Sequence, residues 1–255
     1  MIYKQPDFKT INDHLVALSV KDVLQETDDV RTFRLDNSKG LIALHKPGMF
    51  IKVCLEIKGD KLWRSFSISS SPLHPEIIDL TIKRNQQGEV GNYFFEQIVP
   101  GGEINLKGPL GQFFYDPDLQ PEPVVLLCAG IGITPMMSIV RYLSEIKQNN
   151  TCALFYGASS HRDIIFDEET RKLSTMMPDF QYFLTLSQPS PQWLGYCGRL
   201  NFEFIQPKIS QTLQSRFFLC GPGQFNQELE AHLLAAGVPQ SFIHSEQFHK
   251  KRKSK

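Results

Sequence analysis

Two patterns of hydrophobic and polar positions divide the chain. From about Leu15 to Phe114, short segments alternate between apolar and polar residues and are rich in β-branched and aromatic side chains. This is typical of half-buried strands separated by turns. The expected strands are VALSVKDVLQ, VRTFRLD, MFIKVCLEI, SFSIS and IIDLTIKR. A hairpin turn is expected at Lys58-Gly59-Asp60 and a short helix over Tyr93–Ile98. Several short strands at this spacing predict a closed antiparallel barrel.

The second pattern begins after Asp116–Pro123, a stretch with three prolines that is the expected domain junction. There VVLLCAG is a continuous apolar run, as expected for a parallel strand covered on both faces. The segments that follow are a helix in MMSIVRYLSEIKQN, a strand in TCALFYGA, a helix in DEETRKLSTMM, strands in FQYFLTLS and RFFLCGP, a helix in QFNQELEAHLLAAG that ends at Gly237, and a strand in FIHSEQF. This alternation predicts a doubly wound α/β sheet.

The predicted fold is therefore an antiparallel β-barrel followed by a doubly wound parallel sheet. We expect an N-terminal arm over residues 1–14, the barrel over 15–118, the α/β domain over 119–248 and a basic tail over 249–255. Composition agrees with this division, because 255 residues with 41% hydrophobic content suit a soluble protein of one or two domains.

Several classes of protein are disfavoured. The longest apolar stretch, Val124–Val140, is interrupted by glycine, threonine and proline, so no membrane insertion is expected. The first 14 residues lack the apolar core of a signal peptide. Five scattered cysteines without a C-x-x-C pair argue against a disulfide framework, a zinc site or a plant-type iron–sulfur cluster, and the cytoplasm is the expected compartment. The seven histidines show no metal-ligand spacing, so we expect no metal.

Formal net charge is zero, but its distribution is uneven. Residues 250–255 hold five of the 27 basic side chains, which leaves 22 basic and 27 acidic residues in the rest of the chain. The tail is expected to be a solvated end. Alternatively, it docks an acidic electron-transfer partner or a nucleic acid. We expect no nucleic-acid partner, because neither interleaved aromatics nor a nucleic-acid module is present.

The glycine turn after VVLLCA is the first candidate site. Gly130 and Gly132 have no Cβ, so a diphosphate can approach the backbone closely. Thr134 is expected as the N-cap of the next helix, and Pro135 suits its first position. The turn lacks the third glycine of the usual dinucleotide fingerprint, so a turn that binds nothing is the alternative.

A second candidate is Cys220-Gly221-Pro222, at the end of a later strand of the same sheet. If the strands are parallel, Cys220 is expected to point into the same crevice as Thr134. The alternative is a buried cysteine that only fills space.

The third candidate, Arg64-Ser65-Phe66-Ser67, ends a barrel strand. Arg64 can bind a diphosphate through two parallel N–H bonds. Phe66, two residues on, lies on the same strand face and can cover a flat ring, while Ser67 offers a hydroxyl. An exposed arginine beside a core phenylalanine is the alternative.

In this order, these motifs resemble the ferredoxin–NADP reductase superfamily, specifically the bacterial branch of oxygenase reductases and NAD(P)H:flavin reductases. The resemblance covers roughly Leu15–Phe248 and is carried by RSFS (64–67), QGEVGNYF (87–94), GPLGQF (108–113), GIGITP (130–135), YGAS (156–159), GYCGR (195–199) and CGP (220–222). It implies an FAD-binding barrel domain and a NAD(P)-binding α/β domain, without an iron–sulfur domain, and a protein that is expected to be a monomer.

For the first domain, the resemblance implies that Arg64 binds the FAD diphosphate, Phe66 lies against the isoalloxazine and the Ser67 hydroxyl reaches flavin N5. Three backbone N–H groups are expected to hold the diphosphate at a helix N-terminus, those of Val90, Gly91 and Asn92. In the second domain, the implied nucleotide-binding residues are Gly130, Gly132, Thr134, Pro135, Gly221 and Pro222. Cys220 is implied near the nicotinamide C4, and Glu246 and Phe248 lie in a C-terminal region that often closes on the flavin. Ser67, Cys220 and Glu246 are the implied catalytic residues.

The chain departs from the family pattern at two positions of the first domain. Phe66 stands where tyrosine is commoner, so a hydroxyl contact is lost while the apolar ring remains. Gly91 stands where serine or threonine is frequent, which removes a side-chain bond to phosphate. Weaker retention of FAD is therefore expected.

The resemblance implies hydride transfer from NADH or NADPH to FAD, followed by electron transfer to an external redox protein of ferredoxin or flavodoxin type. The alternatives are a free-flavin reductase and a flavin-binding electron-transfer or regulatory subunit of a complex. NADH is the expected coenzyme, because Gln188 stands where NADP-using relatives often have arginine. Arg162, with Ser159 and Ser160, is the alternative site for a 2′-phosphate.

Overall fold

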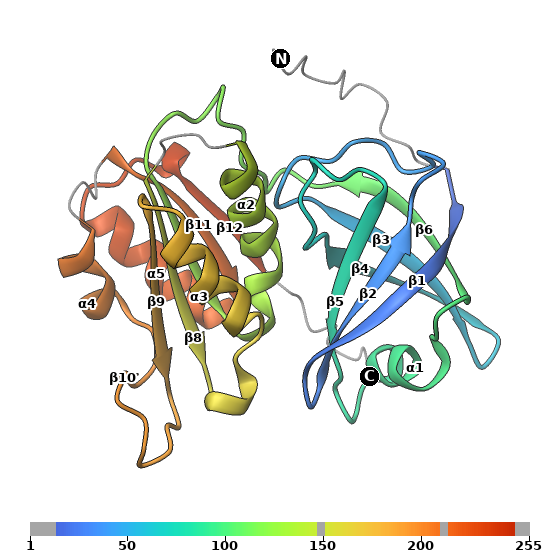
Figure 1. Ribbon diagram of the computed structural model, residues 1–255. Coiled ribbons are helices and arrows are strands. Elements are labelled where there is room, and N and C mark those ends of the chain that lie inside the picture. The colour runs from blue at the N-terminus through green and yellow to red at the C-terminus, as the bar shows by residue number, and fades with distance from the viewer. Residues whose placement is uncertain (1–13, 147–150, 210–213, 248–255) are drawn as a thin grey trace, which may run out of the picture. The chain divides into compact units, whose positions relative to one another are not determined.

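The computed structural model describes residues 14–146, 151–209 and 214–247. The chain divides into two compact units (Figure 1). The first comprises the chain up to Asp116 together with Met137–Glu145, and the second comprises Pro117–Met136 and the chain from Ile146 onward. A part of one helix, Met137–Glu145, therefore belongs to the first unit although it follows the expected domain junction.

Six antiparallel strands form the first unit. They are β1 (Val16–Thr27), β2 (Val30–Asp36), β3 (Phe50–Ile57), β4 (Asp60–Ser67), β5 (Ile77–Lys83) and β6 (Glu103–Leu110), in the sheet order β4-β3-β6-β1-β2-β5. The two outer strands are joined just beyond β4, where Ile68 bridges Leu80 and the Ser69 N–H donates to the Asp79 carbonyl at 3.0 Å. The sheet thus closes on itself, and the predicted antiparallel barrel is confirmed.

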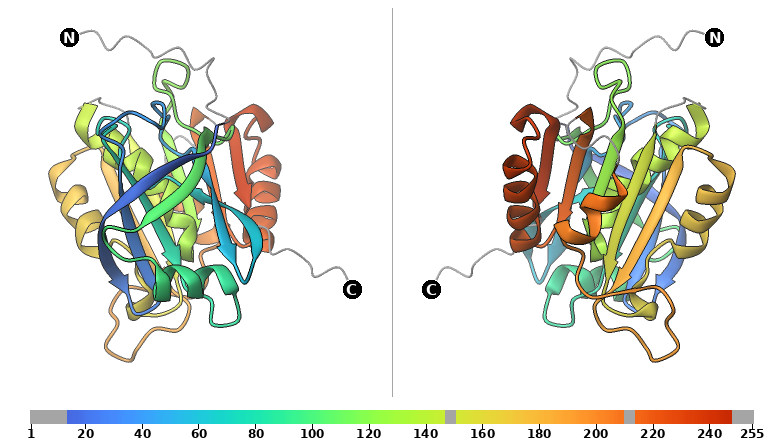
Figure 2. Two further views of the ribbon diagram at one scale, coloured as in Figure 1. Left: turned by 90° about the vertical axis from the view of Figure 1, so that its right-hand side faces the viewer. Right: turned by 90° about the vertical axis from the view of Figure 1, so that its left-hand side faces the viewer.

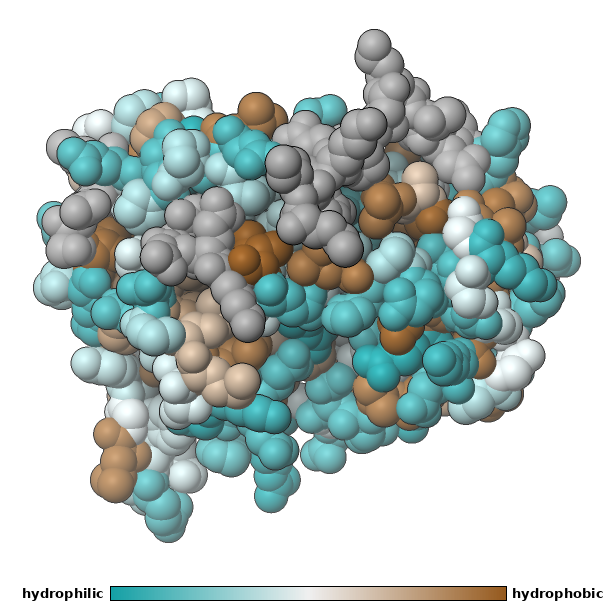
Figure 3. All heavy atoms as spheres, turned by 45° about the horizontal axis from the view of Figure 1, so that its top comes forward, coloured by the Kyte–Doolittle hydropathy of each residue, from teal (hydrophilic) through white to brown (hydrophobic). Residues whose placement is uncertain are grey.

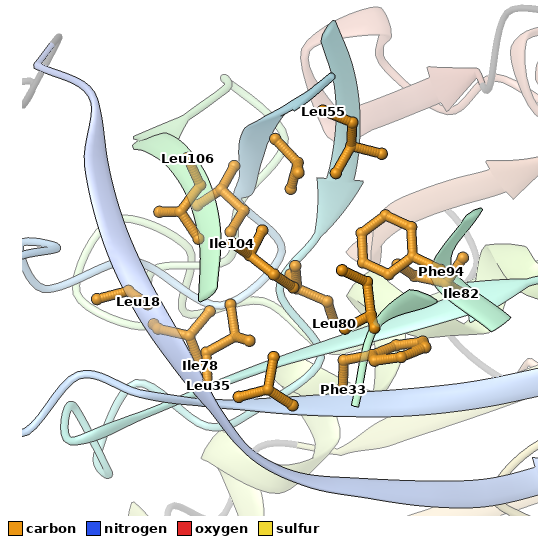
Figure 4. Close-up of a cluster of buried hydrophobic side chains, with 14 of the residues drawn as sticks. Leu18, Phe33, Leu35, Leu55, Ile78, Leu80, Ile82, Phe94, Ile104 and Leu106 are labelled. Carbon is orange, nitrogen blue, oxygen red and sulfur yellow. The ribbon is translucent and has the colours of Figure 1, made fainter. Parts of the chain in front are cut away.

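Alternating side chains explain why these segments form strands. On β3, Ile51, Val53 and Leu55 are buried, while Lys52 and Glu56, which lie on the opposite face, are exposed. Such a period of two places one apolar row inside the barrel. The core that results gathers residues from all parts of the unit (Figure 4). Its labelled members are Leu18, Phe33, Leu35, Leu55, Ile78, Leu80, Ile82, Phe94, Ile104 and Leu106.

Two local predictions in the first unit had different outcomes. The predicted hairpin turn is present, with Lys58 and Gly59 at φ +55° and +86° between the paired residues Ile57 and Asp60. The helix, however, is α1 (Glu89–Gln97) and begins four residues before the predicted start. Its buried residues Val90 and Phe94 are four positions apart, which gives the earlier turn an apolar side facing the core.

Six parallel strands form the sheet of the second unit. They are β7 (Val124–Ala129), β8 (Cys152–Ala158), β9 (Phe180–Leu186), β10 (Tyr196–Cys197), β11 (Arg216–Gly221) and β12 (Ile243–Gln247), in the order β10-β9-β8-β7-β11-β12. The chain winds outward from β7 on both sides, so the predicted doubly wound sheet is confirmed. In such sheets, ligands bind beyond the carboxyl ends of the strands where the winding reverses, here β7 and β11.

The helices of this part of the chain are α2 (Ile133–Ile146), α3 (Asp167–Met176), the short α4 (Phe202–Ile205) and α5 (Gly223–Ala235). Helices lie on both sides of the parallel sheet (Figure 2). Leu229 and Leu233 of α5 pack in one cluster with Val125, Leu127 and other residues of the sheet. Gly237, at φ +90°, follows the end of α5, as the sequence predicted.

Candidate functional site

The end of β4 carries the first group of predicted site residues. Arg64 and Phe66 are two positions apart and pair with Val53 and Ile51 of β3, so both project from the same face of the barrel wall. Phe66 packs edge-on against Phe94 of α1, with ring centroids 5.4 Å apart. The Arg64 guanidinium donates to the Trp63 carbonyl at 2.8 Å, and no carboxylate of the described residues forms an ion pair with it. Its charge is therefore available to an anionic ligand.

Ser67, the last residue of β4, has a buried hydroxyl with no hydrogen-bond partner among the residues that the structure describes. The hydroxyls just after it are bonded: Ser69 Oγ lies 2.9 Å from Thr81 Oγ1, and Ser70 Oγ accepts from the Asp79 N–H at 3.1 Å. A buried polar group without a partner costs about 1–3 kcal/mol. A ligand acceptor beside Ser67 would remove that cost, so the residues at the end of β4 fit a bound flavin.

The start of α1 supplies backbone donors. The residue before it, Gly88, makes no side-chain capping bond, and the N–H groups of Glu89, Val90 and Gly91 have no intrahelical acceptor. The Asn92 N–H already donates to the Gly88 carbonyl at 3.3 Å. Of the three N–H groups expected to bind the diphosphate, that of Asn92 is thus already bonded within the helix, whereas those of Val90 and Gly91 lie in its first turn.

Close packing against the preceding segment explains why residue 91 is glycine, and the sequence did not reveal this. A Cβ at this position would lie 3.1 Å from the Asn85 nitrogen and 3.2 Å from both Arg84 Cα and the Lys83 carbonyl oxygen. All three are backbone atoms and cannot rotate away. The side chain of a serine here would therefore press on the preceding segment. Close packing is thus a reason for glycine at position 91, apart from the phosphate contact that a serine could make.

In the second unit, β7 ends in the turn of Gly130 and Gly132. Gly130 has φ +55° and no atom within 4 Å of an added Cβ, so open space lies beside it. At Gly132 a Cβ would lie 2.0 Å from the Cys220 carbonyl oxygen. Gly132 therefore has a packing reason to be glycine, in addition to the predicted approach of a diphosphate, because the turn after β7 packs directly on the end of β11.

The predicted start of α2 is also corrected. A 3₁₀ turn over Gly130–Gly132 leads straight into α2, which begins at Ile133. Thr134 is consequently inside the first turn instead of capping it, and its hydroxyl donates to the Ile131 carbonyl at 3.0 Å. Pro135 still lies in the first turn, where its missing N–H costs nothing.

Gly221 and Pro222 complete the contact between the ends of β7 and β11. A Cβ on Gly221 would lie 2.7 Å from the Phe225 ring and 3.4 Å from Ala129 Cβ, at the end of β7. Pro222 precedes α5, and its carbonyl accepts the Asn226 N–H at 3.1 Å. The two motifs found in the sequence are therefore neighbours at the point where the sheet reverses its winding.

Cys220 lies in a row of polar side chains on one face of the sheet. It pairs with Cys128 of β7 on one side and with Glu246 of β12 on the other. Its thiol is fully buried, and this burial raises the pKa of Cys220 well above its usual range. The thiol is therefore protonated at neutral pH and closed to solvent, unlike the crevice-facing group expected from sequence.

The backbone carbonyl of Glu246 accepts a hydrogen bond from α5, while one oxygen of its side-chain carboxylate has no hydrogen-bond partner among the described residues. Asn226, fully buried on α5, donates through Nδ2 to the Glu246 carbonyl at 2.8 Å and to Ser245 Oγ at 3.1 Å. Glu246 Oε2 is buried without a hydrogen-bond partner, and burial raises the pKa of this carboxyl to about 7. Such a group can hold or release a proton near neutral pH. The predicted Phe248 lies outside the described residues.

The loops after β8 and β9 are joined at the place where a coenzyme 2′-phosphate was considered. The Gln188 N–H donates to the Ser159 carbonyl at 2.7 Å. Both the N–H and the hydroxyl of Ser160 donate to Asp163 Oδ2, at 2.9 and 2.7 Å. Sequence reasoning missed Asp163, although the S-x-x-D spacing of a capping box was visible. Both hydrogen-bond donors of Ser160 are thereby used by the Asp163 carboxylate, while the Arg162 side chain is exposed.

Among the described residues, no group of three or more histidine, cysteine or acidic side chains could hold a metal ion. No helix in the same part of the chain is long and apolar enough to cross a membrane.

Hydrophobic and hydrophilic residues are interspersed on the face shown in Figure 3.

Two domain families match the chain. Residues 17–115 match the oxidoreductase FAD-binding domain, and residues 126–231 match the oxidoreductase NAD-binding domain. The matches follow one another in the order of the barrel and the parallel sheet.

Similar proteins include reductase components of oxygenases. The chain is 32% identical over 229 residues to the glycine betaine monooxygenase reductase subunit of Chromohalobacter salexigens, covering 89% of this chain and 62% of that protein. It is 31% identical over 249 residues to the ferredoxin reductase component of 3-ketosteroid-9-alpha-monooxygenase of Mycolicibacterium smegmatis, covering 93% and 67%. The chain thus spans less than two thirds of the length of the first of these relatives.

Solved structures agree. The flavohem-like FAD/NAD-binding domain of nitric oxide dioxygenase from Vibrio cholerae superposes with a TM-score of 0.81 at 27% identity, covering 91% of this chain and 98% of that one. A ferredoxin NADP⁺ reductase from Neisseria gonorrhoeae shares the fold, with a TM-score of 0.78 at 21% identity and coverage of 91% and 98%. With an FAD-binding barrel followed by a NAD-binding sheet, the chain belongs to the ferredoxin–NADP reductase superfamily.

Proposed function

We propose that this chain oxidises NADH or NADPH and passes the electrons, through FAD held by the barrel, to an external redox protein. The observation that carries the proposal is Ser67, whose hydroxyl is buried at the end of β4 without a partner. Its position beside Arg64 and Phe66 supports a site for a flavin ring and its diphosphate.

When bound, FAD supplies the redox chemistry, because it takes up two electrons as hydride and can release them singly. The residues of the barrel supply binding and orientation. Arg64 offers a cation to the diphosphate, and the first N–H groups of α1 add donors at the positive end of the helix dipole. Phe66 would cover the flavin ring with its apolar face, and the Ser67 hydroxyl would donate a hydrogen bond to flavin N5.

The second unit holds the coenzyme in this proposal. The open space beside Gly130 admits a diphosphate at the ends of β7 and β11. Cys220, as a buried and protonated thiol, does not act as a nucleophile. Glu246 holds a proton at Oε2, where burial without a partner favours the neutral carboxyl.

We propose NADH as the preferred coenzyme. The 2′-phosphate of NADPH needs a cation at the ends of the second and third strands of such a sheet. Here Gln188 is uncharged, and the hydroxyl and N–H of Ser160 are taken by Asp163. The carboxylate at this position disfavours a second negative charge.

The proposed acceptor is a ferredoxin- or flavodoxin-type protein. Two relatives are named as the reductase subunit of glycine betaine monooxygenase and the ferredoxin reductase component of 3-ketosteroid-9-alpha-monooxygenase. An acceptor that serves an oxygenase is therefore the partner we propose for this chain.

Free-flavin reduction is a second candidate function. The residue before α1 makes no side-chain capping bond, and Gly91 in the first turn has no side chain to offer one. Only backbone donors of this turn can contact the diphosphate, which favours looser binding of FAD.

The test is an anaerobic titration of the FAD-loaded chain with NADH and with NADPH, followed by addition of oxidised ferredoxin. Bleaching of the flavin band and then reduction of the ferredoxin are expected, with FAD eluting together with the protein on gel filtration. No bleaching with either coenzyme would refute the proposal. Bleaching of FAD that elutes separately from the protein would instead support the free-flavin reductase.

A further inference from the structure

The segment just after β4 is fixed to β5 on one side. The Ser69 N–H donates to the Asp79 carbonyl at 3.0 Å, and its hydroxyl lies 2.9 Å from that of Thr81. Ser70 Oγ donates to the Ile77 carbonyl at 3.3 Å. These bonds use the side chains of the segment and one of its N–H groups. The carbonyls of Ser69 and Ser70 remain for other partners.

Those carbonyls are bound by α2, and His45 Nε2 also lies 3.4 Å from the Ser70 carbonyl oxygen. Ser138 Oγ, fully buried, donates to the Ser70 carbonyl at 2.7 Å, and Arg141 Nη1 donates to the Ser69 carbonyl at 2.6 Å. Both donors lie in Met137–Glu145, the part of α2 that belongs to the first unit. They are three positions apart and therefore share one face of the helix.

A third bond continues along the same face of α2. Ser71 Oγ donates to Glu145 Oε2 at 2.6 Å. Glu145 lies seven positions after Ser138, which is close to two helical turns. Three consecutive residues after β4 are thus bonded to three residues of one helix face, whereas Ser67 itself has an unpartnered hydroxyl.

The same helix begins at the glycine turn of the second unit. Ile133–Met136 group with that unit, and the chain continues without interruption through Met137–Glu145 in the first. An α-helix is a stiff element, because each turn is bonded to the next. Ser138 and Arg141 therefore donate from a stiff helix, which holds the segment after β4 in place.

We propose that Ser138 and Arg141 are positioning residues for flavin reduction, a proposal that rests on the function proposed above. They hold the carbonyls of Ser70 and Ser69, and through this segment they fix the position of Ser67, the residue proposed to contact the flavin. Hydride transfer is sensitive to such placement, since a displacement of about 1 Å can cost on the order of 100-fold in rate.

The test compares Ser138→Ala and Arg141→Met with a matched control, Ser144→Ala. Ser144 lies on the same helix, but its hydroxyl donates within the helix, to the Arg141 carbonyl at 2.7 Å. Four quantities are measured: FAD affinity, the visible circular dichroism of bound flavin, single-turnover flavin reduction at saturating coenzyme, and amide hydrogen exchange of the apo chain over residues 67–71.

For Ser138→Ala and Arg141→Met we expect reduction to slow by about 10-fold or more, with coenzyme affinity within about 2-fold of wild type. The visible circular dichroism should change, and exchange over residues 67–71 should be faster than in Ser144→Ala. Rates per bound FAD that match the control would overturn the proposal. So would an unchanged circular dichroism spectrum.

The proposed function can fail separately. If neither coenzyme reduces wild-type FAD, that function is refuted, and hydrogen exchange and circular dichroism still decide the positioning role. Exchange in the two variants that equals that of Ser144→Ala would then reject it.

Discussion

Replacing Gly132 by alanine tests the contact that joins the two sequence motifs of the parallel sheet. The added Cβ would lie 2.0 Å from the Cys220 carbonyl oxygen, 2.6 Å from its carbon and 3.1 Å from the Gly221 nitrogen. Ordinary contacts begin near 3.4 Å, so the two turns would have to separate by about 1.4 Å. All three atoms belong to the backbone, so no side-chain rotation can relieve the clash.

The magnitude follows from the nature of the clash. Inserting a methyl group into a packed site costs typically about 1–3 kcal/mol, and a backbone obstacle places Gly132→Ala at or above the upper end. A loss of about 3 kcal/mol lowers Tm by roughly 6–12 °C for a protein of this size. Gly130→Ala is the control, because its φ of +55° costs about 1–2 kcal/mol but its Cβ would meet no atom.

The assay is thermal and urea unfolding of the apo chain for both variants. Gly132→Ala is expected to lose clearly more stability than Gly130→Ala. Equal losses, or a smaller loss in Gly132→Ala, would refute the packing of the β7 turn on Cys220.

Three further predictions concern FAD retention, pH and the coenzyme. Gly91→Ser should not tighten the binding of FAD, because the added Cβ presses on the backbone of residues 83–85. The substitution should lower the free energy of unfolding by about 1 kcal/mol. Tighter FAD binding in a fluorescence titration would contradict this prediction. The pKa of Glu246 is raised to about 7 from 4.5. The contribution of the neutral carboxyl to the free energy of unfolding is therefore fully present below pH 4.5. Up to about 3 kcal/mol of it is lost as pH rises through 7. Urea unfolding should show a lower free energy of unfolding at pH 8 than at pH 5 in wild type, and this difference should be absent in Glu246→Gln. The same difference in both proteins would contradict the role of Glu246. Finally, kcat/KM should be higher for NADH than for NADPH, whereas an NADPH preference that disappears in Arg162→Ala would show the opposite.

Much of the fold could be predicted because it depends on local pattern. The alternation of Ile51, Val53 and Leu55 with polar residues indicates a barrel strand without any tertiary information. The continuous apolar run of β7 likewise indicates a strand covered on both faces. Helix starts were less predictable. Gly88 precedes α1 without a side-chain capping bond, and a 3₁₀ turn leads into α2, so neither helix begins with the side-chain cap on which sequence reasoning relies.

The candidate site was predictable in its residue types and less so in its physical reasons. The RSFS, GIGITP and CGP motifs pointed to the residues that the two units place at strand ends. The need for glycine at position 132 could not be seen, because it arises from a carbonyl at Cys220, far along the chain. Burial of the Cys220 thiol and the unpartnered oxygens of Ser67 and Glu246 likewise depend on neighbouring strands.

The proposal that the end of β4 is built for a flavin is tested most directly by Ser67→Ala. In the apo chain this change removes a buried hydroxyl without a partner, so stability should rise by about 1 kcal/mol. In the FAD-loaded chain it removes the donor to N5, so flavin reduction by NADH should slow by about 10-fold or more. A variant that is less stable in the apo form, or that is reduced as fast as wild type, would contradict the account.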